Sequence, residues 1–143
     1  IVFMKYYEPL ANNPDFKNQS KAISDLVNKA NKLYEDTEAK NPSIGVKTGL
    51  YLALINIRGG EALGDISLVK RGQELLEEGL KLAPMRLEFI YPLIDLYLML
   101  GNLDEAQKLI NKAKNIRPDL SRNNDYQNML NNIKINQAST SKK

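Results

Sequence analysis

An internal repeat constrains this chain more than any other feature of its sequence. Residues 72–84 fall on residues 106–118 after a shift of 34 positions, and small residues then meet small ones while large apolar residues meet large ones. The pairs are Gly72 with Ala106, Leu75 with Leu109, Leu76 with Ile110, Gly79 with Ala113, Leu82 with Ile116 and Pro84 with Pro118. The helical spacing of the apolar residues predicts two equivalent helices, each ended by its proline. The small residues predict close helix-to-helix approach.

A third copy of the pattern lies upstream at a longer offset. With a shift of 42 positions the matches are Ala30 with Gly72, Tyr34 with Leu76, Thr37 with Gly79 and Pro42 with Pro84. The same shift pairs Tyr51 with Leu93, Leu52 with Ile94, Ile55 with Tyr97 and Gly59 with Gly101. The additional residues are therefore expected between Gly59 and Val69, where the run GGEALGD predicts a loop.

The periodicity of the whole chain predicts an all-α fold of about six helices. We expect these helices at residues 14–39, 43–58, 65–83, 87–100, 102–117 and 121–136. The first two should bury Ile23, Leu26, Val27, Ala30, Leu33 and Tyr34, and Leu50, Tyr51, Leu54 and Ile55, respectively. The last should bury Tyr126, Met129, Leu130 and Ile133. Its other face is rich in asparagine, which suits a terminal capping helix.

The segment 87–120 reads as a helical hairpin that turns at Gly101 and Asn102. Glycine can adopt the left-handed conformation that ends a helix, and asparagine is a good N-cap for the next one. Over its full length this hairpin resembles a tetratricopeptide repeat, on Leu93, Ile94, Tyr97, Gly101, Ala106, Ile110, Ala113 and Pro118. The family's usual early aromatic is replaced by Ile90, and a second glycine by Ile94. The resemblance implies a right-handed superhelix of antiparallel hairpins.

The same resemblance implies a function in binding proteins or peptides, in a groove lined by the first helix of each hairpin. Mapped onto this chain, the groove positions are Glu88, Tyr91, Asp95, Leu98 and Met99, with Val46, Gly49, Ala53 and Asn56 from the preceding hairpin. We expect Tyr91 to be exposed and to act as the main anchor. The lysine and asparagine clamp that some family members use for C-terminal carboxylates is absent from these positions.

The composition excludes several kinds of chemistry. The chain has no histidine and no cysteine, so it cannot form a Ser-His-Asp triad, a thiolate metal site or a disulfide. It also lacks a P-loop and a dinucleotide fingerprint, and we expect no enzyme activity, no cofactor and no metal. The formal charge is +3, but basic and acidic residues are interleaved, so nucleic-acid binding by a helical repeat is a weaker alternative.

A second resemblance concerns the protein from which the chain comes. The run LAPMRLEFIYPLIDLYLMLGNLDEA, together with EPLAN near the start, resembles the helical-repeat tail of bacterial membrane proteins of the O-antigen ligase and polymerase type. The alternative function is therefore that of a C-terminal fragment tethered to a bacterial cell envelope. On this interpretation residues 1–12 are a membrane-proximal stump, residues 13–136 the repeat domain and residues 137–143 a disordered tail.

Overall fold

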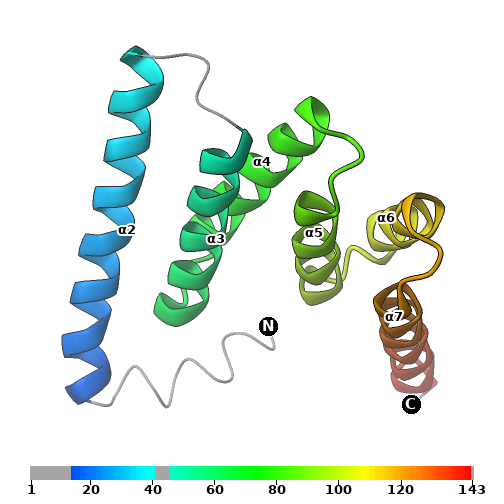
Figure 1. Cartoon of the computed structure of the whole chain (residues 1–143). Helices are drawn as coiled ribbons and strands as arrows, with labels where there is room; N and C mark the ends of the chain where they lie inside the picture. Colours follow the sequence, from blue (N-terminus) through cyan, green and yellow to red (C-terminus); the bar gives the residue numbers. More distant parts are fainter. Residues whose placement is uncertain (1–13, 41–45, 143) are drawn as a thin grey trace. The chain divides into compact units, whose positions relative to one another are not determined.

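The computed structural model describes residues 14–40 and 46–142, and all of its regular structure is helical (Figure 1). The helices are α2 (Pro14–Lys40), α3 (Val46–Leu63), α4 (Ile66–Leu82), α5 (Leu87–Leu100), α6 (Leu103–Ile116) and α7 (Ser121–Thr140). They form two compact units that divide after Leu82, one with α2, α3 and α4 and the other with α5, α6 and α7. The predicted all-α class is confirmed.

The two hairpins close in the same way. Gly64 after α3 and Gly101 after α5 both have positive φ, 66° and 77°, which only glycine adopts without strain. The amide of Asp65 donates to the carbonyl of Gly60 at 2.9 Å, and that of Asn102 to the carbonyl of Tyr97 at 2.8 Å. These bonds satisfy carbonyls that the helix end leaves without partners. The turn predicted at Gly101 and Asn102 is confirmed.

The loop predicted at GGEALGD is wrong. Helix α3 runs through Gly59 and Gly60 to Leu63, so only Gly64 and Asp65 separate it from α4. The glycines are needed for packing: a Cβ at Gly59 would overlap Cγ2 of Val27, and one at Gly60 would lie 2.7 Å from Cγ2 of Val69. When the first helices of the two hairpins, α3 and α5, are aligned at their turns, Gly64 matches Gly101. The offset between these helices is therefore 37 residues rather than the predicted 42. Helix α4 is longer than α6, 17 residues against 14, which accommodates the remaining difference.

The second helices bury the small residues that the repeat predicts. Gly72, Ala106 and Ala113 are buried, and α4 continues through Gly72 and Gly79. A Cβ at Gly72 would lie 2.7 Å from the carbonyl oxygen of Ala53 in α3. No real Cβ tolerates such a distance, so the absent side chain sets the close approach of α3 and α4.

Two side-chain amides bond reciprocally at one helix contact in each unit, between α2 and α3 and between α6 and α7. In the first unit Asn31 of α2 and Asn56 of α3 each donate one hydrogen bond to the other. In the second unit Gln107 of α6 and Gln127 of α7 do the same, at 2.8 and 2.9 Å. Asn31 and Gln107 are equivalent in the repeat, because each follows the aligned Ala30 or Ala106. The repeat is thus visible in the contacts as well as in the sequence.

Helix α7 differs from its predicted form in two respects. It continues to Thr140, so the polar tail expected from residue 137 begins inside the helix. Its buried face consists of Asn123, Tyr126 and Leu130, with Ile133 half-buried, whereas Met129 is 49% exposed. The interior stripe therefore contains an asparagine in place of the predicted methionine.

Candidate binding groove

The groove predicted on α5 is only partly open. Glu88, Asp95 and Met99 are exposed, but Tyr91 and Leu98 are each only 8% exposed. The predicted exposure of Tyr91 and Leu98 is therefore wrong. Both residues are among the buried side chains of α5.

Helix α7 is the element that buries Tyr91. The rings of Tyr91 and Tyr126 stack with centroids 5.6 Å apart, and the Tyr91 hydroxyl donates to Oδ1 of Asn123 at 3.0 Å. The guanidinium of Arg122 lies 4.4 Å from the centroid of the Tyr91 ring. Nδ2 of Asn123 donates to the carbonyl of Arg117 at 2.7 Å, so its amide links α5 to the turn before α7. Tyr91 is therefore an anchor for the chain's own last helix.

The pKa of Tyr126 is shifted by its burial and by two charged neighbours, Asp95 and Arg122. Burial first, and then the carboxylate of Asp95, raise the pKa of Tyr126 to about 12, while Arg122 opposes the shift. The guanidinium of Arg122 donates to the Tyr126 hydroxyl at 3.0 Å. The phenol stays neutral at ordinary pH, which suits a structural contact between helices.

The positions predicted on α3 also lie mainly on packing faces. Ala53 and Asn56 are fully buried, and Val46 and Gly49 are half-buried. The side chain of Asn56 is hydrogen-bonded to that of Asn31 in α2, and the carbonyl oxygen of Ala53 lies next to Gly72 of α4. Ala53 and Asn56 therefore serve packing contacts within the first unit.

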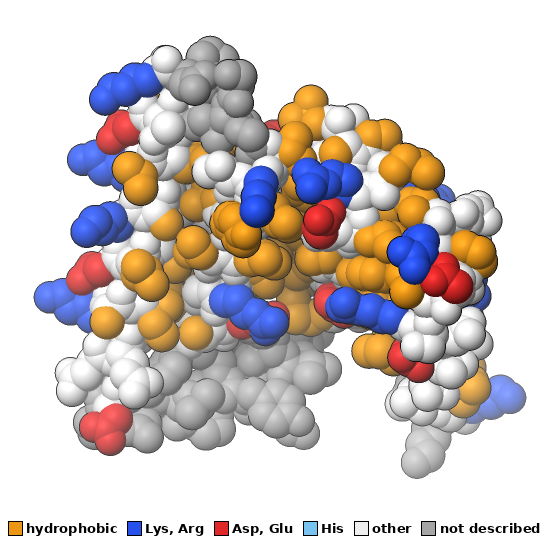
Figure 2. Space-filling model, in the orientation of Figure 1, with side chains coloured by type: hydrophobic (Ala, Val, Ile, Leu, Met, Phe, Trp, Pro, Cys, Tyr) orange, Lys and Arg blue, Asp and Glu red, His pale blue; other side chains and the backbone are white. Residues whose placement is uncertain are grey.

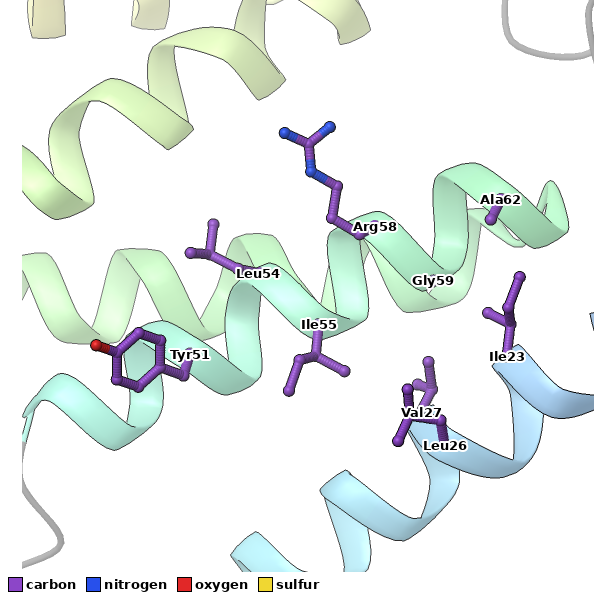
Figure 3. Close-up of a pocket in the computed structure, with 9 residues that line it drawn as sticks. All are labelled: Ile23, Leu26, Val27, Tyr51, Leu54, Ile55, Arg58, Gly59 and Ala62. Carbon is purple, nitrogen blue, oxygen red and sulfur yellow. The ribbon is translucent and has the colours of Figure 1, made fainter.

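The apolar surface that the first unit leaves open lies between α2 and α3. We call it the α2–α3 groove. It encloses about 640 Å³, and Figure 3 shows its residues as sticks. They are Ile23, Leu26 and Val27 of α2 with Tyr51, Leu54, Ile55, Arg58, Gly59 and Ala62 of α3. In Figure 2 hydrophobic side chains gather over these two helices, with Lys and Arg at the edges.

Several residues predicted as core stand at this surface. Leu26 is 63% exposed, Tyr51 56% and Ile55 37%, and Leu33 farther along α2 is 67% exposed. The helical spacing places these residues on apolar faces, but it does not show whether another helix covers them.

The charge on the groove is basic. Arg58 is the charged residue among those that line it, and its side chain stands at the α3 edge with 82% exposure. Its partner is Glu61, one turn along α3, at 3.3 Å. The ammonium of Lys47 lies 6.0 Å from the ring centroid of Tyr51. An acidic group on an incoming molecule would therefore meet cations at this edge.

The described residues show no other kind of site. Within residues 14–40 and 46–142, no three His, Cys, Asp or Glu side chains lie close enough together to hold a metal ion. In the same ranges, no helix has the length and apolar content needed to cross a membrane. The first twelve residues, to which the membrane-proximal interpretation applies, lie outside the described residues.

Comparison with known protein families identifies part of the repeat. Residues 69–133 match a family model described as a tetratricopeptide repeat. The matched segment covers most of α4, all of α5 and α6, and α7 as far as Ile133. No curated protein matches the chain.

Proposed function

We propose that this chain, in which residues 69–133 match a tetratricopeptide repeat, is a scaffold that holds a protein partner and catalyses no reaction itself. Repeats of this type generally serve as protein-interaction scaffolds. The fold supports the proposal because packed helices present their surface residues at fixed positions, which lowers the entropy lost on binding.

One observation carries the proposal furthest. The α2–α3 groove exposes Leu26, Tyr51 and Ile55 side by side on two packed helices. Scattered apolar residues on a surface are normal, whereas a contiguous apolar hollow with a charged edge is typical of an interaction site. Tyr51 lies at one end of this hollow, and aromatic residues are a frequent source of binding energy at interfaces.

The exposed part of the predicted α5 surface is a secondary contact in this proposal. Glu88, Asp95 and Met99 remain accessible to a partner. Glu88 pairs with Arg86 at 3.1 Å on the surface, so this ion pair can exchange for one with a partner. Tyr91 has no part in this contact, because α7 covers it.

The membrane-protein alternative is a proposal about the parent protein. It depends on residues outside the described ranges, and the complete open reading frame tests it directly. A series of upstream apolar segments, each long enough to span a bilayer, would support the alternative. The scaffold proposal for the repeat itself is compatible with either outcome.

Site-specific photo-crosslinking in the native cell tests the scaffold function. A photoreactive phenylalanine analogue replaces Tyr51 in the groove, and in a matched variant it replaces the exposed Asn128 of α7. We expect discrete protein adducts at Tyr51 and none at Asn128. Equal adducts at both positions would indicate random collision. The absence of any adduct at Tyr51, Glu88 and Met99 would reject the scaffold proposal.

A further inference from the structure

Helix α7 covers Tyr91 through contacts that lie near the beginning of α7. The ring stacked on Tyr91, the acceptor of its hydroxyl and the guanidinium over its ring belong to Tyr126, Asn123 and Arg122, respectively, and all three residues are part of α7. With α7 in place, Tyr91 is only 8% exposed. Movement of α7 away from α5 would therefore expose the Tyr91 ring and its hydroxyl.

The apolar surface that holds α7 in place is small. Of its 20 residues α7 buries three, Asn123, Tyr126 and Leu130, and one of these is an asparagine. Gln127 and Ile133 are half-buried, and residues 134–140 are all exposed. Tyr126 and Leu130 are therefore the main apolar contributions to the packing of α7, because hydrophobic stabilisation follows the apolar area removed from water.

The other contacts of α7 are mainly polar. Gln127 pairs with Gln107, and Asn123 bonds the Tyr91 hydroxyl and the carbonyl of Arg117. Such hydrogen bonds add little net stability, because water replaces them when the groups separate. Helix α5, by contrast, buries eight of its 14 residues. Segments with few buried apolar contacts open locally before the rest of a protein unfolds, so we expect α7 to open while α5 stays folded.

We propose that α7 is an internal cover on a binding site centred on Tyr91, and that a helix from a partner protein displaces it. The proposal rests on the scaffold function and adds a second site with the chemical class of its partner. The partner helix carries the groups by which α7 itself binds. These are a side-chain amide for the Tyr91 hydroxyl, an aromatic ring three residues later and an aliphatic residue four residues after the ring, which is the spacing of Asn123, Tyr126 and Leu130.

The short connection between α6 and α7 makes α7 a strong competitor for this site. Residues 117–120 join the two helices. A segment tethered so closely has an effective concentration in about the millimolar range. A free helix with the same contact groups therefore binds weakly while α7 is intact, and it binds more tightly when the contacts of α7 are weakened.

A labelled peptide with the sequence of residues 121–140 serves as the partner helix in a test, with the full chain as receptor. Leu130→Ala and, separately, Arg122→Ala in the receptor weaken its own α7 and leave α5 unchanged. The apparent affinity for a covered site is lowered by the fraction of molecules in which the site is open. We expect the peptide to bind more than about tenfold more tightly to Leu130→Ala than to the wild type, and about two- to fivefold more tightly to Arg122→Ala.

Controls on both molecules make the test specific. A peptide that carries Tyr126→Ala should bind the Leu130→Ala receptor at least about tenfold more weakly, because it lacks the ring that stacks on Tyr91. A peptide of the same composition in scrambled order should not bind. Asn128→Ala in the receptor, on the exposed face of α7, should leave the affinity unchanged. Fluorescence anisotropy measures binding, and circular dichroism confirms that each receptor is folded. If Leu130→Ala unfolds the second unit, the exposed Arg122 provides the deciding variant.

Hydrogen exchange of the unmodified chain gives an independent measurement. The amides of residues 124–133 should exchange faster than those of α5, because α7 opens separately. Equal exchange rates in the two helices would overturn the proposal. So would a peptide affinity that neither receptor variant raises, or one that Tyr126→Ala in the peptide leaves intact. Adducts at Tyr51 in the cell without peptide binding at Tyr91 would reject this inference and leave the scaffold function standing.

Discussion

Asn31 and Asn56 exchange two hydrogen bonds across the interface of α2 and α3, with the Nδ2 of each side chain donating to the Oδ1 of the other at 2.9 and 3.0 Å. Each Nδ2 also donates to a carbonyl in its own helix, that of Val27 for Asn31 and that of Leu52 for Asn56. Asn56 is fully buried, so this pair satisfies polar atoms that water cannot reach. It also fixes the register of α2 on α3, because a shifted helix would leave these atoms without partners.

Replacement of Asn56 by leucine should therefore destabilise the first unit by about 1–3 kcal/mol, because Asn31 keeps its polar atoms and loses their partner. The double variant Asn31→Leu/Asn56→Leu should be less destabilised than the sum of the single variants. Urea unfolding followed by circular dichroism measures the difference. The matched control is Gln127→Leu in α7, because Gln127 is only half-buried whereas Asn56 is fully buried, so its loss should matter less. Equal losses for Asn56→Leu and Gln127→Leu would contradict the role of burial.

The sequence predicts best those features that depend on local spacing. The six helices, the turn at Gly101 and the buried Ala106, Ile110 and Ala113 are all present in the structure. Each follows from the apolar period of a helix or from a residue type that ends one. These signals lie within a few residues of the position that they predict.

Features that depend on a distant partner could not be predicted in the same way. Gly59 reads as a helix end, but it lies inside α3, and the residue there is small because Val27 of α2 occupies the space that a side chain would need. Tyr91 reads as an exposed anchor, but its partner Asn123 lies 32 residues farther along the chain. The α2–α3 groove was missed for a related reason. Periodicity shows that Leu26 and Ile55 lie on apolar faces, and it does not show whether another helix covers them.

Larger side chains at the buried positions of α6 should destabilise the fold. Ala106 and Ala113 are fully buried at the positions where helices approach closely. Ala106→Leu or Ala113→Leu should lower the free energy of unfolding by about 1–3 kcal/mol, because the larger side chain forces the helices apart. Glu105→Gln is the control, since Glu105 is exposed and pairs only on the surface with Lys108. If both kinds of variant unfold at the same urea concentration, the assignment of the α6 faces is wrong.

Tyr91→Phe should loosen α7 without unfolding the chain. The substitution retains the stacked ring and removes the hydroxyl that donates to Asn123, which is only 2% exposed. An acceptor left buried without its donor costs about 1–3 kcal/mol. Amide hydrogen exchange should therefore accelerate in residues 121–140, with little change in α3 and α4. Exchange that accelerates equally in both units would show that Tyr91 does not act through α7.

The raised pKa of Tyr126 predicts how stability depends on alkaline pH. The phenol has a pKa of about 12 in the folded chain, against 10.0 without burial and Asp95. Below pH 10 both states keep the proton, so this group favours neither. Between pH 10 and about 12 the unfolded chain loses the proton more readily, so the free energy of unfolding falls as pH rises. Tyr126→Phe removes this contribution, and its urea midpoint should fall less steeply over the same interval. The difference in tyrosinate absorbance between the two proteins reports the titration of Tyr126 itself. A difference curve centred near pH 10 would show that Asp95 and burial do not hold this proton.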